Sequence, residues 1–456
     1  MAPTSRKLAL EALNRLARFE QRLDPILAEL LAASPFSDPR DLALFHQLVL
    51  GVLRWRGRLD WIIEQVSARP LTRIDPSALN ALRIGLFQVV FLDRIPVSAA
   101  VNTAVELVKA DSSPRAAGFV NAVLRKAAGR WRQIPLPDAK RSAARHLAVR
   151  ESFPRWMVRR WISRFGFAEA ERLCAAANQI PPTTVRANTL KTSRSRLQDA
   201  LAEAVEDLRE TAHAPDGLCF SHPSTPIDAL PMFEAGGFQV QDEAAQLVSL
   251  LLDPAPGQRV LDACAGLGGK TGHIAQLMGN RGVLVATDKD AGKLETLDRE
   301  MGRLGVTIVA PETADLEAPL QAGANRFDRV LLDAPCSGLG VIRRNPDAKW
   351  KSAARDLSGF GARQQRLLNR LAGLVSPSGL LVYSVCSMEP EENESVVDAF
   401  LDPHPEFAVV QPTEHRRTLP QAFFDARGFF RSFPHRHGTD GFFAAVFRRR
   451  RTDSSR

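Results

Sequence analysis

The stretch RVLDACAGLGGKTG at residues 259–272 joins an apolar strand to a glycine-rich turn and the start of a helix. Gly266, Gly268 and Gly269 allow positive φ angles and a close approach to a ligand, which the helix N-terminus then faces. Asp288 ends the next predicted strand, where an acidic side chain can bind ribose hydroxyls. The stretch therefore predicts a nucleoside-type cofactor site that suits NAD and S-adenosylmethionine alike. Its spacing does not fit a Walker A phosphate loop.

Short apolar segments alternate with amphipathic ones on both sides of this turn. Near-continuous apolar strands separated by helices are typical of a doubly wound, mostly parallel sheet. We therefore expect an α/β Rossmann-like domain over residues 241–450. The expected strands are 259–263, 282–288, 306–310, 329–335 and 379–385, the expected helices are 270–278, 293–304, 363–375 and 391–401, and segments 407–410 and 441–447 could add an antiparallel pair.

The N-terminal third has a different pattern, with apolar residues three and four positions apart in segments separated by proline-containing breaks. This spacing predicts an independent all-α domain over residues 1–140. Residues 145–240 are mixed and predict a small α+β module, with strands near 181–190 and 216–222 and a helix over 194–208. Residues 451–456 form a basic and polar tail.

The positive charge lies almost entirely at the N-terminal end. Residues 1–150 hold 23 Lys and Arg against 13 Asp and Glu, whereas the whole chain carries a net charge of +9. A basic helical domain joined to a neutral catalytic-looking one favours a polyanion held by the first and processed by the second. We therefore expect nucleic-acid binding, although a well-solvated helical surface is the alternative for any single arginine.

Composition narrows the class of protein further. The 456 residues imply two or three domains, and no run of eighteen apolar residues suggests a membrane span. The five cysteines are scattered, without CxxC or Cys/His spacing, so neither a disulfide framework nor a metal site is expected. We expect a cytoplasmic protein with no membrane and no metal.

Two cysteines follow predicted parallel strands, Cys336 in DRVLLDAPCSGLG and Cys386 in SGLLVYSVCSMEPEEN. The carboxyl ends of parallel strands line the ligand crevice of an open α/β sheet. Two thiols beside a cofactor turn predict covalent chemistry on a substrate. Each cysteine taken alone could instead be an inert buried thiol.

Several motifs in one order resemble the Sun/Nop2 family of RNA cytosine-5 methyltransferases. Within that family the chain is similar to bacterial small-subunit rRNA enzymes that join a NusB-like RNA-binding domain to a methyltransferase domain. The motifs are VQDEAAQLV, CAGLGGKT, DAPCSGLGVIRRNPDAKW, YSVCSMEPEEN and PHRHGTDGFF, with GVLRWRGRLD and NAVLRK in the helical part.

The resemblance implies an S-adenosylmethionine-dependent enzyme that methylates carbon 5 of a cytosine in small-subunit (16S) rRNA, naked or partly assembled. It implies that Cys386 is the nucleophile and that Cys336 assists product release. The oligomeric state stays open, with a monomer as the default expectation for an enzyme that carries its own RNA-binding domain. Glu312 is an alternative to Asp315 in the cofactor set. That set comprises Cys264, Ala265, Gly266, Leu267, Gly268, Gly269, Lys270, Asp288, Asp315 and Asp333.

The chain departs from the family pattern at two places. Gly266 and Leu267 replace Ala-Pro in the turn, which makes the loop more flexible. Val385 replaces the threonine that usually precedes the nucleophile. We expect slower turnover from the missing hydroxyl, and unchanged methylation kinetics in Val385→Thr would contradict this expectation.

Other functions remain open from the sequence. A DNA cytosine-5 methyltransferase would use Cys336 as its nucleophile, and a nicotinamide-dependent dehydrogenase would explain the glycine turn but neither thiol. A non-catalytic RNA-binding or ribosome-assembly protein on a methyltransferase shell is the main alternative. We also expect Arg343, Arg344, Lys349 and Trp350 to border the crevice and grip RNA.

Overall fold

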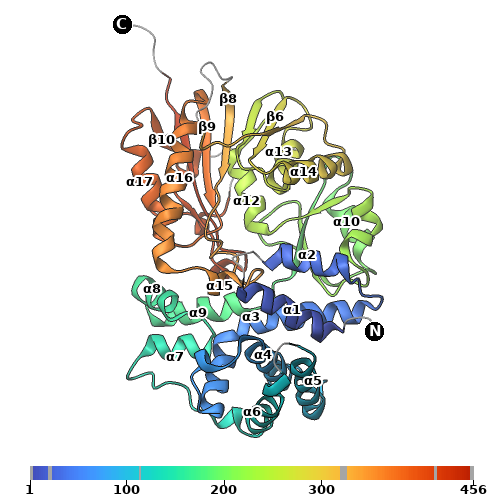
Figure 1. Ribbon diagram of the computed structural model, residues 1–456. Helices are drawn as coiled ribbons and strands as arrows, with labels where there is room; N and C mark the ends of the chain where they lie inside the picture. Colours follow the sequence, from blue (N-terminus) through green and yellow to red (C-terminus); the bar gives the residue numbers. More distant parts are fainter. Residues whose placement is uncertain (1–3, 19–22, 112–113, 319–325, 415–418, 452–456) are drawn as a thin grey trace. The chain divides into compact units, whose positions relative to one another are not determined.

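The computed structural model describes residues 4–18, 23–111, 114–318, 326–414 and 419–451 (Figure 1). The chain forms two compact units. The first comprises Met1–Gln179 with Ile342–Ala354, and the second comprises Ile180–Val341 with Arg355–Arg456. Among the described residues, no helix combines the length and apolarity needed to span a membrane. Residues 452–456 of the predicted basic tail lie outside the described residues.

The first unit is helical. Its two longest helices begin at the pairs Asp38-Pro39 and Asp75-Pro76, where the proline fits the first helical position and the aspartate caps free backbone N–H groups. Asp38 accepts a hydrogen bond from the Arg40 backbone at 2.8 Å, and Asp75 accepts one from Ala78 at 3.0 Å. The helices are α1 Ser5–Arg18, α2 Leu23–Ala33, α3 Pro39–Ser67, α4 Pro76–Phe91, α5 Val97–Ala110, α6 Ala117–Arg130, α7 Ala143–Arg150, α8 Arg155–Phe165, α9 Phe167–Asn178 and α15 Ala348–Lys351.

Helix α4 is buried along nearly its whole length and forms the centre of this unit. A helix enclosed on all sides must be covered by others, and the apolar core is shared with α1, α3, α5 and α6. The expected helical domain ended at residue 140, but α7–α9 continue the unit to Gln179. The unit also includes residues 342–354, which the sequence pattern places in the Rossmann-like domain.

The second unit begins with a four-stranded antiparallel sheet in the order β2-β3-β1-β4. Residues 206–208 were predicted as helix, and this is wrong, because they open strand β2. Val205 and Leu208 suit a helical spacing, but Val205 lies before β2 and Leu208 within it, and both pack partly buried on the core of this sheet. The β2–β3 register is irregular between Glu206 and Arg209. The elements are β1 Thr183–Ala187, α10 Arg194–Leu201, β2 Glu206–Glu210, β3 Gly217–Ser221, α11 Pro231–Glu234 and β4 Phe238–Val240.

A larger sheet in the order β10-β12-β9-β8-β5-β6-β7 follows, with β11 paired to β12. Strands β5 to β9 are parallel, whereas β10, β11 and β12 are antiparallel, as predicted for the C-terminal segments. The strands are β5 Arg259–Asp262, β6 Val283–Asp288, β7 Val309–Thr313, β8 Phe327–Asp333, β9 Val375–Val385, β10 Phe407–Val409, β11 Phe430–Arg431 and β12 Phe443–Arg449.

Helices cover both faces of this sheet, as Figure 1 shows. Successive strand residues point to opposite faces: Leu331 packs with α12, α13 and α14, while Val330 and Leu332 pack with α16 and α17. This is the predicted doubly wound α/β arrangement. The helices are α12 Glu243–Leu252, α13 Gly269–Leu277, α14 Ala291–Leu304, α16 Leu357–Ala372, α17 Glu394–Leu401 and α18 Pro434–His437.

Strand β7 lies three residues later than predicted. The apolar run 306–310 suggested the strand, but β7 is an edge strand whose residues are mostly exposed. An edge strand needs pairing on one side, and the polar Glu312 and Thr313 pair with β6 without apolar packing. Ile308 instead packs on the core from the connection before β7.

Candidate active site

The chain order of the parallel strands reverses direction between β5 and β8, so ligands are expected at the carboxyl ends of these strands. The glycine turn leaves β5 at this point. Gly266 and Gly268 have φ angles of 57° and 86°, which L side chains rarely adopt. A Cβ on Gly268 would also lie 2.9 Å from Leu297, whereas one on Gly266 would meet nothing within 4 Å. The turn is thus packed on one side and open at Gly266.

Asp288 lies at the end of β6, beside this turn. One carboxylate oxygen accepts a hydrogen bond from the Gly266 backbone at 3.1 Å, and the other accepts one from the Asp290 backbone at 3.0 Å. The structure therefore places Asp288 next to the predicted turn. The rest of the turn differs in exposure, because Ala265 is buried while Leu267 is exposed.

Asp262 is a buried carboxyl group below the turn that the sequence analysis did not single out. Its Oδ2 accepts a hydrogen bond from the Thr271 hydroxyl at 2.8 Å, and its side chain is 1% exposed. Burial raises the pKa of Asp262 to about 7, with the neighbouring Asp333 adding to the shift. The same burial, together with these carboxylates, raises the pKa of Cys264 to about 12, so Cys264 is a neutral thiol.

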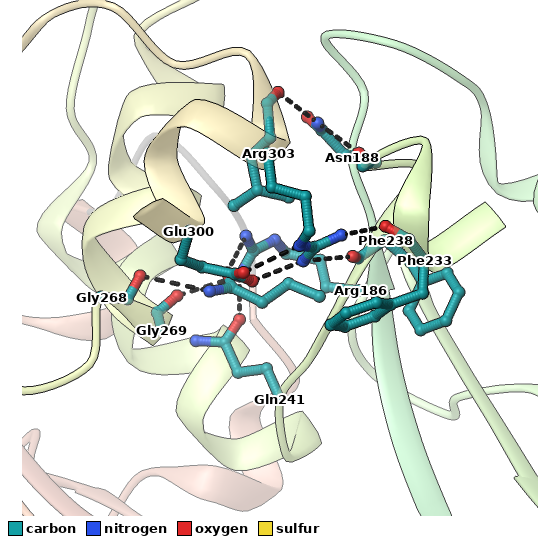
Figure 2. A network of polar contacts seen from close by, with 12 residues as sticks. Arg186, Asn188, Phe233, Phe238, Gln241, Gly268, Gly269, Glu300 and Arg303 are labelled. Carbon is teal, nitrogen blue, oxygen red and sulfur yellow. Dashed lines mark hydrogen bonds and ion pairs between the residues drawn. The ribbon is translucent and has the colours of Figure 1, made fainter. Parts of the chain in front are cut away.

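A buried arginine, Arg186, forms hydrogen bonds that support the glycine turn (Figure 2). Arg186 of β1 donates to the carbonyl oxygen of Gly269 at 3.2 Å and to the side chain of Gln239 at 2.8 Å. Gln239 in turn donates to the Gly268 carbonyl at 3.4 Å. Gln241 also accepts from Arg186. The small antiparallel sheet therefore supports the glycine turn through backbone carbonyls, which no sequence motif indicated.

The two motif cysteines meet where β8 and β9 end. The Sγ atoms of Cys336 and Cys386 lie 3.1 Å apart, and both thiols are free and partly buried. The hydrogen bond to Cys386, burial and the nearby Glu392 raise the pKa of the Cys336 thiol well above its usual range. Cys336 is therefore the protonated partner of the pair.

Lys270 follows the glycine turn, pairs with Asp333 and interacts electrostatically with Cys386. Its Nζ lies 2.6 Å from Oδ2 of Asp333, and Oδ1 of Asp333 accepts a hydrogen bond from the Ser384 hydroxyl at 2.9 Å. Burial lowers the pKa of Lys270, but the charges of Asp333 and Cys386 outweigh burial and raise it. Lys270 is therefore a positive charge held beside Asp333. Ser384, which the motifs did not single out, holds Asp333 through its hydroxyl.

Asp315 makes a local side-chain contact that does not reach the glycine turn or the two cysteines. It is exposed, follows β7, and accepts a hydrogen bond from the Glu317 backbone at 2.9 Å. Glu312 is also exposed and lies within β7. Neither carboxylate contacts the glycine turn in the described contacts, so the adenine contact stays a prediction. Val385, which precedes the predicted nucleophile, is fully buried in the apolar core.

The prediction that residues 343–350 grip RNA at the crevice is wrong for Arg343 and Lys349, which are buried in the helical unit. Lys349 is fully buried in the helical unit, where its Nζ donates to the carbonyls of Arg54 and Ser152 and to Asn178 at 2.6–3.2 Å. The Trp350 indole donates to the Leu53 carbonyl at 2.6 Å. Arg343 is 6% exposed and its carbonyl accepts from Arg54. A cation beside an aromatic residue suggested an RNA surface, but here it anchors a loop.

Comparison with known proteins assigns the family. A family model described as 16S rRNA methyltransferase RsmB/F matches residues 249–448, the NusB family matches residues 3–129, and the ferredoxin-like domain of RsmF/B-like methyltransferases matches residues 153–228. The probable ribosomal RNA small subunit methyltransferase B of Synechocystis sp. is 37% identical over 97% of this chain and 98% of its own length. The chain belongs to the RsmB/F family of 16S rRNA methyltransferases.

Further relatives agree with this membership. The probable ribosomal RNA small subunit methyltransferase B of Bacillus subtilis is 35% identical over 98% of both chains. The crystal structure of PH0851 matches with a TM-score of 0.81 and 28% identity over 98% of this chain and 99% of that one. The predicted family, the Rossmann-like methyltransferase fold and the NusB-like domain are confirmed.

Proposed function

We propose that this protein transfers a methyl group from S-adenosylmethionine to carbon 5 of one cytosine in small-subunit rRNA, through a covalent bond between Cys386 and carbon 6. Membership of the RsmB/F family supports methyl transfer to 16S rRNA. The observation that carries the finer assignment is the contact between the Cys336 and Cys386 sulfurs at the carboxyl ends of β8 and β9. A dehydrogenase would give this pair of thiols no task.

The turn fits the proposed cofactor. Gly266 offers open space beside a backbone N–H, and Asp288 presents a carboxylate at the same place. Such an acidic side chain binds ribose hydroxyls, while the N-terminus of α13 lies at the turn. The bound sulfonium supplies an electrophilic methyl group. We assign Cys264, Ala265, Gly266, Leu267, Gly268, Gly269, Lys270, Asp288, Asp315 and Asp333 to the cofactor side of the site.

The chemistry requires a nucleophile, because carbon 5 of cytosine is unreactive on its own. Addition of the Cys386 thiolate to carbon 6 forms an S–C bond and moves electron density to carbon 5, which can then take the methyl group. Lys270 beside Asp333 supplies positive potential that favours the thiolate of Cys386.

Attack of carbon 5 on the methyl group would break the sulfonium S–CH3 bond and leave a neutral thioether. The carbon-5 proton then passes to solvent water, and the electron pair of that C–H bond re-forms the 5,6 double bond as the bond between Sγ and carbon 6 breaks. Cys386 returns as a thiolate, and at this stage we assign the assisting role to Cys336.

The target base must leave its stack to reach a partly buried thiol. A loop or single-stranded cytosine is therefore the cheaper substrate, since flipping a paired base costs a few kcal/mol. The NusB-like unit supplies basic helices for the rRNA backbone, and the excess charge of residues 1–150 supports this role. We propose that a monomer acts on naked or partly assembled small-subunit rRNA.

Covalent trapping tests the assignment of the two cysteines. A Cys336→Ala variant should accumulate an RNA–protein adduct that survives denaturing electrophoresis, because the nucleophile adds but release is impaired. Cys386→Ala should form no adduct and transfer no methyl group. The buried Cys174→Ala variant is a control that should behave like the unmodified protein. An adduct that forms with Cys386→Ala and disappears with Cys336→Ala would reverse the assignment.

A further inference from the structure

The carboxylate of Glu392 lies between the loops that carry the two cysteines. Glu392 is 0% exposed, and its Oε1 accepts hydrogen bonds from the Ser337 backbone at 2.8 Å and from Gln364 at 3.1 Å. Its Oε2 accepts hydrogen bonds from the hydroxyls of Ser337 and Ser387, both at 2.5 Å. Ser337 directly follows Cys336, and Ser387 directly follows Cys386. One buried side chain therefore joins the residues adjacent to both sulfurs.

A second set of contacts fixes Glu392 itself. The hydroxyl of Tyr383, the one tyrosine of the chain, lies 2.5 Å from the Glu392 carbonyl oxygen and 3.0 Å from Oε1 of Gln364. Gln364 also donates to the carbonyl of Pro335 at 3.0 Å. Pro335 and Ser337 flank Cys336, so both sides of this cysteine are held. A fully hydrogen-bonded polar network of this kind has a single arrangement.

The charges around the two sulfurs are unequal. Glu392 is among the groups that disfavour a thiolate at Cys336, after the hydrogen bond to Cys386 and burial. Lys270, whose ammonium is paired with Asp333, interacts electrostatically with Cys386. The two sulfurs therefore have different charged neighbours. The titratable groups that face this pair are Lys270 of α13, Asp333 of β8, Tyr383 of β9 and Glu392.

We propose that Glu392 is a positioning residue that fixes the spacing of Cys336 and Cys386 and keeps the proton on Cys336, which leaves Cys386 as the nucleophile of the pair. The idea rests on the proposed function, because it deepens the division of roles between the two thiols. Glu392 is fully buried and acts through the serines, not on the substrate. Its carboxylate accepts four hydrogen bonds, and a neutral or shorter side chain could not accept them all.

Site-resolved alkylation of the full-length protein tests the proposal without RNA. Iodoacetamide should modify Cys386 faster than Cys336 in the unmodified protein, as measured by mass spectrometry of the two peptides at several pH values. In Glu392→Gln the ratio of the two alkylation rates should fall about tenfold, which corresponds to a change of about one unit in the difference between the two thiol pKa values. In a steady-state methylation assay the same variant should lower kcat while KM for rRNA stays unchanged.

The matched control is Glu391→Gln, which removes the same charge from the adjacent residue but none of these side-chain hydrogen bonds. It should keep the native thiol preference. If Glu392→Gln fails to fold, Ser337→Ala and Ser387→Ala each remove one arm of the network and should each shift the preference in the same direction. A native preference in Glu392→Gln or in both serine variants would overturn the proposal.

The two proposals can fail separately. If Glu392→Gln changes the thiol preference but the unmodified protein methylates no rRNA, the positioning role stands and the proposed function fails. If methylation occurs at cytosine but Glu392→Gln has native thiol preference and native kcat, the positioning role fails alone.

Discussion

At the scale of single residues, the site depends on charged groups placed out of water. Lys270, Asp333 and the two thiols lie within one contact network, and Asp262 lies below it. The motifs around Cys336 and Cys386 were sufficient to predict that these sulfurs meet. Ser384, Glu392 and Asp262 were not singled out, because a serine or a carboxylate in a strand or loop has no spacing that distinguishes a contact from a solvated side chain.

Asp262 gives a prediction for stability against pH. Its pKa is raised to about 7 in the folded protein, above the unfolded value of 3.8, so folding favours the protonated form. The stability it contributes is full below pH 3.8 and is lost as pH rises through 7. Asp262→Asn should therefore gain stability relative to the unmodified protein by about 2–3 kcal/mol between pH 5 and pH 8. Urea unfolding at both pH values measures this.

The control for this experiment is Asp298→Asn, at an exposed position on α14. The difference in free energy of unfolding between this variant and the unmodified protein should be the same at pH 5 and pH 8. An equal difference between Asp262→Asn and the unmodified protein at pH 5 and pH 8 would show that Asp262 is ionised in the folded state.

At the scale of elements, the alternation of apolar strands and amphipathic helices predicted the doubly wound sheet. Predictions from local sequence patterns failed where contacts between distant segments determined the secondary structure. Strand β7 is polar because it is an edge strand, and β2 replaced the end of a predicted helix because residues 206–210 pair with β3. The support of the glycine turn by Arg186 was also not predictable, since it joins residues 83 positions apart.

Arg186 gives a prediction for cofactor affinity. Arg186→Met would leave the Gly269 carbonyl and Gln239 without their donor, in a region where Arg186 is 1% exposed. The turn should lose order, and the Kd for S-adenosylmethionine should rise roughly tenfold, equivalent to ~1.4 kcal/mol. Calorimetric titration measures it, with exposed Arg299→Met as control. Unchanged affinity would show that the turn keeps its shape without this support.

Lys349 gives a prediction for the helical unit. The side chain donates to three acceptors and lies 3.7 Å from the centre of the Phe153 ring. Lys349→Met keeps most of the volume but leaves those buried acceptors unpaired, so the free energy of unfolding should fall by about 1–3 kcal/mol. Chemical denaturation measures the loss, with the exposed Lys109→Met as control. A loss no larger than that of the control would contradict the anchoring role.

At the scale of the whole molecule, the sequence predicted the family, the NusB-like domain and the methyltransferase fold. Composition could not reveal that residues 342–354 belong to the helical unit, because a basic segment with a tryptophan also suits an RNA surface. Cys336 lies six residues before Ile342, so the chain enters the helical unit shortly after this cysteine.

The uneven charge predicts how rRNA binding responds to salt. Arg125 and Arg130 are exposed on α6 of the basic region. Replacing both with alanine should weaken binding to 16S rRNA and reduce the slope of log K against log salt by about 1–2. Filter binding between about 50 and 200 mM salt, where phosphate contacts dominate the affinity, measures the slope. The same slope in the double variant would place the phosphate contacts elsewhere.

The central claim is methyl transfer to carbon 5 of a cytosine in small-subunit rRNA. The most direct test incubates the full-length protein with labelled S-adenosylmethionine and unmethylated 16S rRNA, and then maps the product by bisulfite sequencing. The account predicts a single 5-methylcytosine with the unmodified protein and none with Cys386→Ala. Transfer of label without any bisulfite-resistant cytosine, or equal product from Cys386→Ala, would contradict it.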